Sequence, residues 1–260
     1  MSQLTIPKRI AQVWITIKDS EIPRKWDVGR FSINQQLPDW DYHVYREDEI
    51  EQLVNKIDPS FMSTYNSFPY GIQKADAARA FILYEYGGVY MDMDYQVLNS
   101  EFESLFEGAP GYPHLYLVPS GNIPSYFTNS FMASTPGHPF WLQYINRMRV
   151  PNPWYMIGKH FEVQNATGPL ALTDVARKTH HKITILPSKK ITPCSVCDMS
   201  CDIEVAYLRQ LEGSSWIGFD TYIYIKIMCY HRPIIFWVVV IAFIIVIFFI
   251  LWLIYYLFIR

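Results

Sequence analysis

Residues 74–94 read Lys74-Ala-Asp76-Ala-Ala-Arg79-Ala-Phe-Ile-Leu-Tyr-Glu-Tyr-Gly87-Gly88-Val-Tyr-Met-Asp92-Met-Asp94. The apolar residues of the first part recur at helical spacing, at Ala75, Ala78, Phe81, Ile82 and Tyr86. Gly87 stands where a left-handed C-cap would end the helix, and Val89, Met91 and Met93 then alternate as in a strand. The segment therefore predicts a helix, a glycine stop and a strand that ends in paired carboxylates.

Asp92 and Asp94 are the candidate metal ligands of this segment. Residues i and i+2 of a strand point to one face, so two carboxylates at this spacing offer hard oxygen ligands to one Mg²⁺ or Mn²⁺ ion. Such an ion can hold a diphosphate. Two acidic residues on a solvated turn are commoner than a metal site, so the pair alone carries little weight.

The combination of Asp76, Arg79, Gly-Gly-Val-Tyr and Asp92-Met-Asp94 in this order resembles the DXD glycosyltransferases of glycosyltransferase family 32. That family includes fungal initiating mannosyltransferases and inositolphosphoceramide mannosyltransferases, and the resemblance extends over roughly residues 5–220. It implies an α/β fold, a GT-A-like and Rossmann-like domain that binds a nucleotide sugar. Asp76 and Arg79 lie three apart on one helix face, so both are candidates to contact the donor sugar.

Two further segments resemble parts of the donor site. Ile6 to Trp14 resembles the opening strand of the family, with Trp14 near the nucleotide base, where an indole can stack. A core tryptophan on the first strand is an equally weighted reading. Thr128 to Phe140 resembles the segment that lines the donor sugar, and Asn129 is its best polar candidate. His138, between Gly and Pro, is more typical of a surface or capping histidine than of a catalyst.

The C-terminal part of the resemblance departs from the family pattern. Residues 213–220 resemble its Ser-Trp signature, in which Ser214, Ser215 and Trp216 can donate to phosphate oxygens. Relatives usually carry a histidine just before this signature, whereas this chain has Arg209, Gln210, Leu211 and Glu212. Glu212 is a candidate substitute as the third metal ligand.

Two regions remain outside this resemblance or ambiguous within it. Asn165 begins a glycosylation sequon at an expected active-site turn, where we interpret the sequon as accidental. A loop-like stretch contains Cys194, Cys197 and Cys201. A disulfide among them would be expected in an oxidising compartment, and free thiols would be expected in the cytosol. A zinc site would need a fourth ligand, and none is evident near the cluster.

Residues 233–259 carry no charge and are dominated by Ile, Val, Phe, Leu, Trp and Tyr, which predicts a transmembrane helix after a catalytic domain at residues 1–230. Without a signal peptide pattern at Met1, we expect a single-pass, tail-anchored protein. Lys226, His231 and Arg232 before the helix favour a cytosolic domain, whereas the family resemblance implies the Golgi lumen or another endomembrane. The membrane face stays open at this stage.

Composition agrees with an enzyme of one sizeable domain. The chain has 260 residues, 17% of them aromatic, and its net charge of −2 argues against a nucleic-acid-binding surface. The family resemblance implies a retaining glycosyltransferase that uses Mn²⁺ or Mg²⁺ and a nucleotide sugar, with GDP-mannose as the expected donor. The expected acceptor is a glycolipid such as inositolphosphoceramide, or another glycan. The alternative is a catalytically silent protein of the same fold that binds a sugar nucleotide or a partner.

Overall fold

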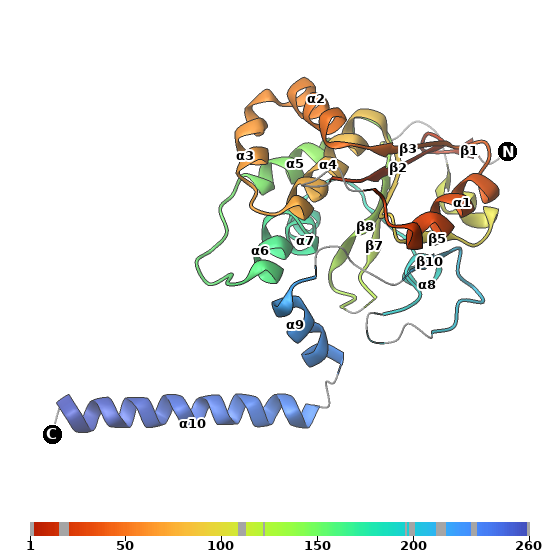
Figure 1. Ribbon diagram of the computed structural model, residues 1–260. Helices are drawn as coiled ribbons and strands as arrows, with labels where there is room; N and C mark the ends of the chain where they lie inside the picture. The colour runs from red at the N-terminus through yellow and green to blue at the C-terminus, as the bar shows by residue number, and fades with distance from the viewer. Residues whose placement is uncertain are drawn as a thin grey trace. The chain divides into compact units, whose positions relative to one another are not determined.

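The computed structural model describes residues 3–15, 21–108, 113–121, 123–195, 197, 201–211, 217–229 and 233–258. The chain divides into two compact units, Met1–Gly218 and Phe219–Arg260. Each unit is described by itself below, and Figure 1 gives the labels of their elements.

A mixed sheet organises the first unit. Among the described residues its six strands run in the order β3 (Asp41–Tyr45), β2 (Arg9–Val13), β4 (Gly88–Met91), β8 (Phe127–Ser134), β7 (Leu115–Pro119) and β9 (Thr184–Ile185). β2 pairs in parallel with β3 and β4, whereas β8 is antiparallel to both β4 and β7. Two short antiparallel pairs flank it: β1 (Gln3–Leu4) with β6 (Glu107–Gly108), and β5 (Tyr95–Val97) with β10 (Leu208–Gln210).

Helices cover the sheet (Figure 1). The α-helices of the first unit are α1 (Asp27–Gln36), α2 (Glu47–Ile57), α3 (Met62–Ser67), α4 (Gly71–Tyr86), α5 (Pro139–Met148), α6 (Lys159–Ala166), α7 (Pro169–Lys178) and α8 (Ser188–Ile191). Short 3₁₀ helices cover Arg24–Trp26, Pro59–Phe61 and Ser100–Phe106. The α/β class predicted from the sequence is confirmed.

Two hydrophobic cores lie on opposite faces of the sheet, and β4 contributes to both. Val89 and Met91 pack into one core with α1 and the 3₁₀ helix at 100–106, while Tyr90 packs into the other with α4 and α5. Every residue of β4 is buried, because helices cover both faces of this central strand. The alternation seen in the sequence therefore separates two buried faces rather than a buried face from a wet one.

The glycine pair after α4 brings β4 against its neighbours. Gly87 has φ +63° and ψ −154°, so the helix stops there as predicted, although this conformation is not the left-handed helical cap that the sequence suggested. Gly88 has φ +82°, and a Cβ added there would lie 2.5 Å from the carbonyl oxygen of Arg9 on β2. Both positions require glycine because L-residues avoid positive φ and the neighbouring backbone leaves no room.

Two cysteines of the 194–201 cluster form a disulfide. Cys194 and Cys201 are bonded to each other, and the described part of the chain contains no free cysteine. A disulfide was one of the alternatives that the sequence left open.

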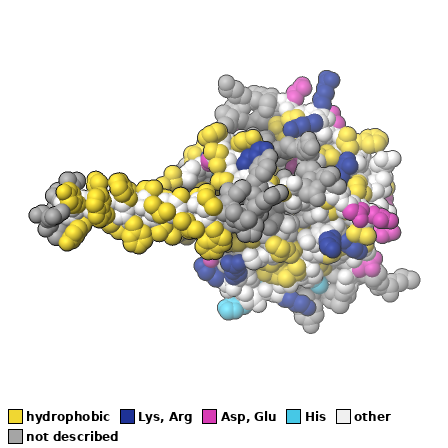
Figure 2. All heavy atoms as spheres, turned by 90° about the horizontal axis from the view of Figure 1, so that it is seen from below, with side chains coloured by type: hydrophobic (Ala, Val, Ile, Leu, Met, Phe, Trp, Pro, Cys, Tyr) yellow, Lys and Arg dark blue, Asp and Glu magenta, His cyan; other side chains and the backbone are white. Residues whose placement is uncertain are grey.

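The second unit contains α9 (Phe219–Cys229) and α10 (Pro233–Phe258). Within α10, residues 237–256 are long and apolar enough to cross a membrane, and none of this stretch is buried in protein. Figure 2 shows apolar side chains along the length of this helix. A core helix of a soluble protein would be mostly buried, so α10 is a candidate membrane span.

Candidate active site

Polar groups meet at the carboxyl-terminal edge of β2 and β4. Because these strands are parallel neighbours, Trp14 after β2 and Asp92 after β4 lie at the same edge. Gln12 Nε2 donates to the carbonyl oxygen of Asp92 at 3.0 Å, and the Asp92 amide donates to the carbonyl oxygen of Ser130 on β8 at 2.9 Å. Ligands of open α/β sheets bind at this kind of edge.

The two DXD carboxylates lie in a turn. β4 ends at Met91, and the amide of Tyr95 donates to the carbonyl oxygen of Asp92 at 3.2 Å, which closes a turn over residues 92–95. The expectation that strand geometry aligns Asp92 and Asp94 on one face is therefore wrong. The turn gives each carboxylate its own surroundings, because Asp92 faces α4 and Asp94 faces β10.

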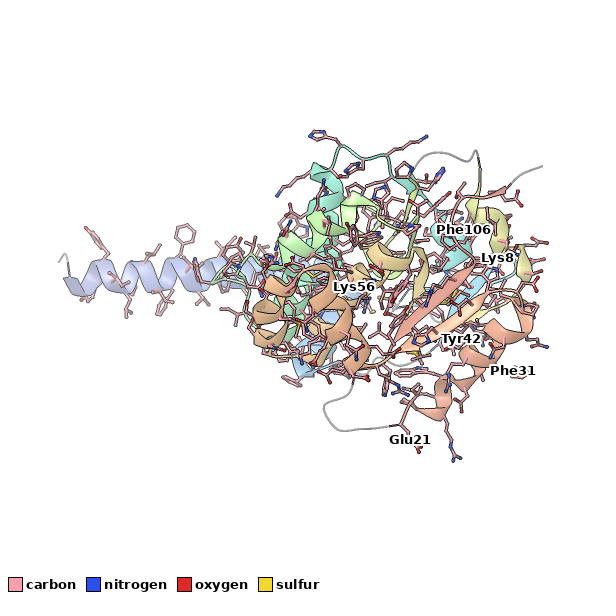
Figure 3. The ribbon with its side chains drawn as sticks, turned by 90° about the horizontal axis from the view of Figure 1, so that it is seen from above. Lys8, Glu21, Phe31, Tyr42, Lys56 and Phe106 are labelled. Atoms are coloured by element: carbon pink, nitrogen blue, oxygen red, sulfur yellow. A yellow bond between two sulfur atoms is a disulfide. The ribbon has the colours of Figure 1, made fainter. Side chains whose placement is uncertain are left out.

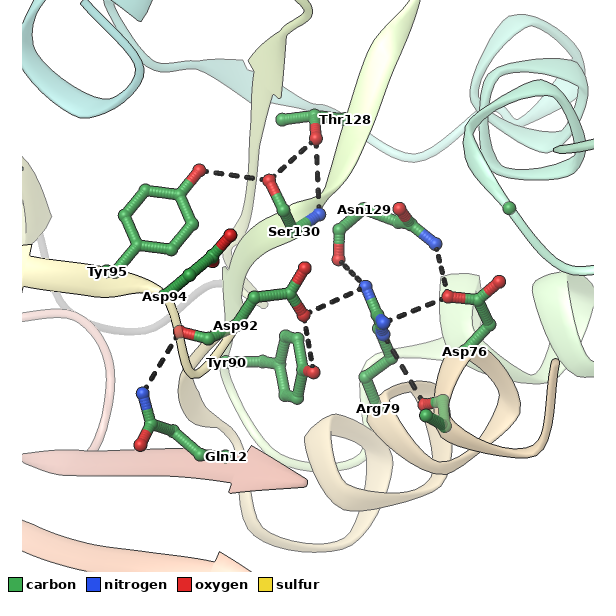
Figure 4. Close-up of polar contacts among 12 residues, drawn as sticks. Gln12, Asp76, Arg79, Tyr90, Asp92, Asp94, Tyr95, Thr128, Asn129 and Ser130 are labelled. Atoms are coloured by element: carbon green, nitrogen blue, oxygen red, sulfur yellow. Dashed lines mark hydrogen bonds and ion pairs between the residues drawn. The ribbon is translucent and has the colours of Figure 1, made fainter. Parts of the chain in front are cut away.

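Arg79 joins α4 to the turn through a buried cluster (Figure 4). Its guanidinium lies 2.9 Å from Asp76 Oδ1 and 3.3 Å from Asp92 Oδ1, and it donates to the carbonyl oxygen of Asn129 at 2.6 Å. The side chains of Arg79 and Asp76 are only 3% and 4% exposed, whereas that of Asp92 is 30% exposed. Asp92 is thus the member of the cluster that reaches solvent.

Both carboxylate oxygens of Asp76 are occupied within the protein. Asn129 Nδ2 donates to Oδ1 at 2.9 Å, and Thr167 Oγ1 donates to Oδ2 at 2.9 Å. Burial raises the pKa of Asp76 to about 7, although the charge of Arg79 and the Thr167 hydrogen bond act in the opposite direction. In this arrangement Asp76 fixes Arg79, Asn129 and Thr167 relative to one another.

Asp92 has its direction set by two neighbours. Tyr90 donates its hydroxyl hydrogen to Asp92 Oδ1 at 2.8 Å, the same oxygen that Arg79 approaches. The Arg79 guanidinium also lies 4.8 Å from the centre of the Tyr90 ring, in cation–π range. Burial raises the pKa of Asp92, while the charge of Arg79 opposes that shift.

Asp94 is held from β10. Gln210 Nε2 donates to Asp94 Oδ2 at 3.1 Å, and the amide of Leu211 donates to the Asp94 carbonyl oxygen at 2.6 Å. Asp94 Oδ1 is buried and has no hydrogen-bond partner among the residues that the structure describes. Burial, followed by the negative charge of Asp92, raises the pKa of Asp94 to about 7.

These carboxylates fit a divalent cation. A buried carboxylate oxygen without a partner is costly, and a hard cation would satisfy it. No group of three or more His, Cys, Asp or Glu that could hold a metal occurs among the residues the structure describes. A site with one or two carboxylates, completed by substrate phosphates and water, is the arrangement typical of Mg²⁺.

The structure places some of the other predicted site residues. Trp14 is half-buried at the sheet edge, and its ring meets that of Trp26 edge-on with centroids 5.5 Å apart. His138 is buried, and its Nδ1 accepts from the Phe140 amide at the start of α5. His138 is therefore a capping residue, as its turn context indicated. The remaining candidates lie outside the described residues: Glu212, Ser214, Ser215 and Trp216.

Sequence reasoning missed three residues that build the site. Gln12 is a fully buried polar residue inside an apolar strand, a signal that could have marked it. Thr167 and Gln210 come close to Asp76 and Asp94 from 91 and 116 positions away. Thr167 belongs to the sequon that the sequence placed at an active-site turn, but no local pattern indicates which carboxylate Thr167 or Gln210 contacts.

Solved structures with the same fold define the class. The UDP-bound glycosyltransferase domain of the YGT toxin matches with a TM-score of 0.52 and 8% identity, over 88% of this chain and 90% of that one. The PaToxG glycosyltransferase matches with a TM-score of 0.50 and 17% identity, over 68% of this chain and 70% of that one. Both likenesses show the fold, which is of the GT-A type.

Sequence comparison then gives the family. Residues 23–114 match the model for the glycosyltransferase sugar-binding region containing the DXD motif. Inositol phosphoceramide mannosyltransferase 1 of Schizosaccharomyces pombe is 32% identical over 238 residues, 89% of this chain and 68% of the relative. A mannosyl phosphorylinositol ceramide synthase of Saccharomyces cerevisiae is 31% identical over 171 residues, 65% of this chain and 42% of the relative. The chain belongs to the DXD-containing glycosyltransferases of glycosyltransferase family 32.

Proposed function

We propose that this chain transfers a mannosyl group from GDP-mannose to a glycolipid of the inositol phosphoceramide type, with Mn²⁺ or Mg²⁺ held by Asp94 and Asp92. The observation that carries the proposal is the buried Oδ1 of Asp94, which has no partner within the described part of the chain, beside the partly exposed carboxylate of Asp92. A bound cation would stabilise the charge that builds on the departing nucleoside diphosphate.

The neighbours of the DXD turn have separate tasks in this proposal. Asp92 contacts the donor because it is the exposed end of the cluster, while Arg79 and Tyr90 hold its carboxylate in one direction. Asp76 and Arg79 are positioning residues, since nearly all of their surface is covered by protein. Such fixed groups need little reorganisation when charge develops during the reaction.

The donor and acceptor are proposed from the relatives. Those described above are named for mannose transfer to inositol phosphoceramide or for synthesis of its mannosylated form, and the first matches 89% of this chain. A catalytic unit joined to a membrane-spanning α10 would also meet lipid head groups at high effective concentration. Both arguments favour a lipid acceptor. Retention of anomeric configuration is proposed from the family resemblance alone.

The disulfide supports an oxidising location. Cys194 and Cys201 lie in the first unit, and disulfides persist mainly in secretory compartments and outside the cell. We therefore propose a single-pass protein whose catalytic unit faces the lumen of the Golgi or another endomembrane. This choice favours the family resemblance over the charge pattern around the helix.

The test is a donor and acceptor panel with the full chain in lipid vesicles. GDP-mannose, UDP-glucose and UDP-galactose are each offered with inositol phosphoceramide, with Mn²⁺ or with EDTA, and the lipid product is measured. The proposal predicts a mannosylated lipid from GDP-mannose only, lost in EDTA. Transfer of another sugar would replace the donor assignment, and release of nucleoside diphosphate without lipid product would overturn the acceptor assignment.

A further inference from the structure

The connection between α5 and α6 carries an exposed apolar tip. Trp154, Tyr155 and Ile157 are 88%, 60% and 75% exposed, in a segment that runs along the outside of the first unit (Figure 1). Residues 150–158 contain no charged side chain, while Arg149 and Lys159 stand at either end. Three large apolar side chains this close together on one exposed loop are unusual for a surface that faces only water.

The base of this connection is fixed by hydrogen bonds. Asn152 Nδ2 donates to the carbonyl oxygen of Glu162 at 3.1 Å, and Asn165 Nδ2 donates to Asn152 Oδ1 at 2.7 Å. The Met156 amide donates to the carbonyl oxygen of Pro153 at 3.0 Å, which closes a turn at the tip. These hydrogen bonds therefore hold the connection in a defined conformation in which the apolar tip is exposed.

We propose that the tip formed by residues 154–157 enters the interfacial region of a lipid bilayer. Trp and Tyr are the residues enriched at membrane–water interfaces, because their rings are apolar and carry one polar group each. A tether such as α10 supplies high effective concentration at that surface, so one small tip suffices.

The helix α6 connects the tip to the donor site. α6 follows it with only eight residues, and Thr167 at the end of α6 donates to Asp76 in the buried cluster. At 1.5 Å per residue, α6 spans about 12 Å. Membrane contact at the tip would thus set the height of the catalytic unit above the bilayer. This consequence rests on the proposed lipid acceptor, whereas the membrane contact itself does not.

Fluorescence quenching tests the contact without any use of activity. The full chain is placed in vesicles whose lipids are brominated either near the head groups or near the chain ends. The emission that Trp154→Phe removes is obtained as the difference from wild type. The proposal predicts that this component is quenched more by the shallow bromine than by the deep one. A component that neither lipid quenches would overturn the proposal, including the case in which protein covers the tip.

Kinetics test the positioning role. The double variant Trp154→Ser, Ile157→Ser should raise the apparent KM for vesicle-borne lipid acceptor about tenfold, given the value of burying large apolar side chains. Its KM for the nucleotide sugar should stay unchanged. Phe31→Ser is the matched control, because Phe31 is 68% exposed on α1 (Figure 3), whereas the tip belongs to the connection between α5 and α6. Quenching with an unchanged acceptor KM would overturn the positioning role.

Discussion

Replacing Arg79 with Met should destabilise the catalytic unit in a pH-dependent way. The guanidinium stands 2.9 Å from Asp76 and 3.3 Å from Asp92, so the variant leaves one buried and one partly exposed carboxylate without their cation. Removing one partner of a buried ion pair costs about 3–5 kcal/mol. That cost is limited by protonation, since a neutral carboxyl group tolerates burial.

The pH dependence follows from the raised pKa values. Asp76 has a pKa of about 7 in the folded chain, well above its unfolded value, so its contribution to stability is greatest below the unfolded pKa and declines as pH rises through 7. Without Arg79 that pKa is higher still, and the decline continues to higher pH. Above pH 7, where Asp76 of the wild type loses its proton, each carboxyl group that stays protonated only in the variant adds a slope of about 1.4 kcal/mol per pH unit to the difference in unfolding free energy. The free energy of unfolding that Arg79→Met loses relative to wild type should therefore be larger at pH 8 than at pH 6.

The assay is denaturant unfolding of the full chain in detergent at pH 6, 7 and 8, without divalent metal. Arg149→Met is the matched control, because Arg149 pairs with Asp58 at 2.5 Å where both side chains are about a quarter exposed. The control should lose about 1 kcal/mol or less, with no added slope in this range. A loss below 1 kcal/mol for Arg79→Met, equal at all three pH values, would refute the role of Arg79 as the counter-ion of the cluster.

Three further predictions concern single contacts. Gly88→Ala should destabilise by about 3 kcal/mol or more in the same unfolding assay, because its Cβ would meet the Arg9 carbonyl oxygen. Gly137→Ala is the control: its Cβ has no described atom within 4 Å, so it should lose only about 1–2 kcal/mol, the cost of a positive φ. Equal losses would contradict the packing argument. His138 has a pKa lowered to about 4 by burial and by two other histidines, so it favours the fold above pH 6.5 and loses that contribution as pH falls towards 4. His138→Asn keeps a capping side chain and should abolish up to about 3 kcal/mol of the stability that the wild type loses as pH falls towards 4. An unchanged dependence of stability on pH would contradict the lowered pKa of His138. Gln210→Leu should weaken Mn²⁺ binding about tenfold, measured by calorimetry at pH 7, because Asp94 loses a hydrogen bond that favours its charged form; unchanged affinity would contradict this role.

Much of the catalytic unit could be predicted from the sequence because its signals are local. The helix over residues 71–86, the glycine stop and the following strand are set by side-chain period and by backbone conformations that favour glycine. The candidate membrane helix follows from an uncharged apolar run. In each case a short stretch of chain contains the whole physical reason for its structure.

The geometry of the site could be predicted only in part. Asp76, Arg79 and Asp92 were identified as a set, and the structure brings them into contact. Their local sequence could not reveal that Thr167 donates a hydrogen bond to Asp76, or that Asp92 and Asp94 lie in a turn and not in a strand. Those features depend on contacts between segments far apart in the chain. Burial then decides which carboxylates reach a ligand, and burial is a property of the folded unit.

The most direct test of metal-assisted transfer at Asp94 compares Asp94→Asn with Asp41→Asn in the full chain. Asp41 is an acidic residue at the start of β3, 62% exposed in its side chain, and lies outside the site. The measurement is release of GDP from GDP-mannose with Mn²⁺ and lipid acceptor present. We expect Asp94→Asn to lose at least a hundredfold in rate, about 2.7 kcal/mol of transition-state stabilisation, while Asp41→Asn stays near wild type. Wild-type rates in Asp94→Asn, or release that is unaffected by EDTA, would contradict a metal-assisted transferase centred on Asp94.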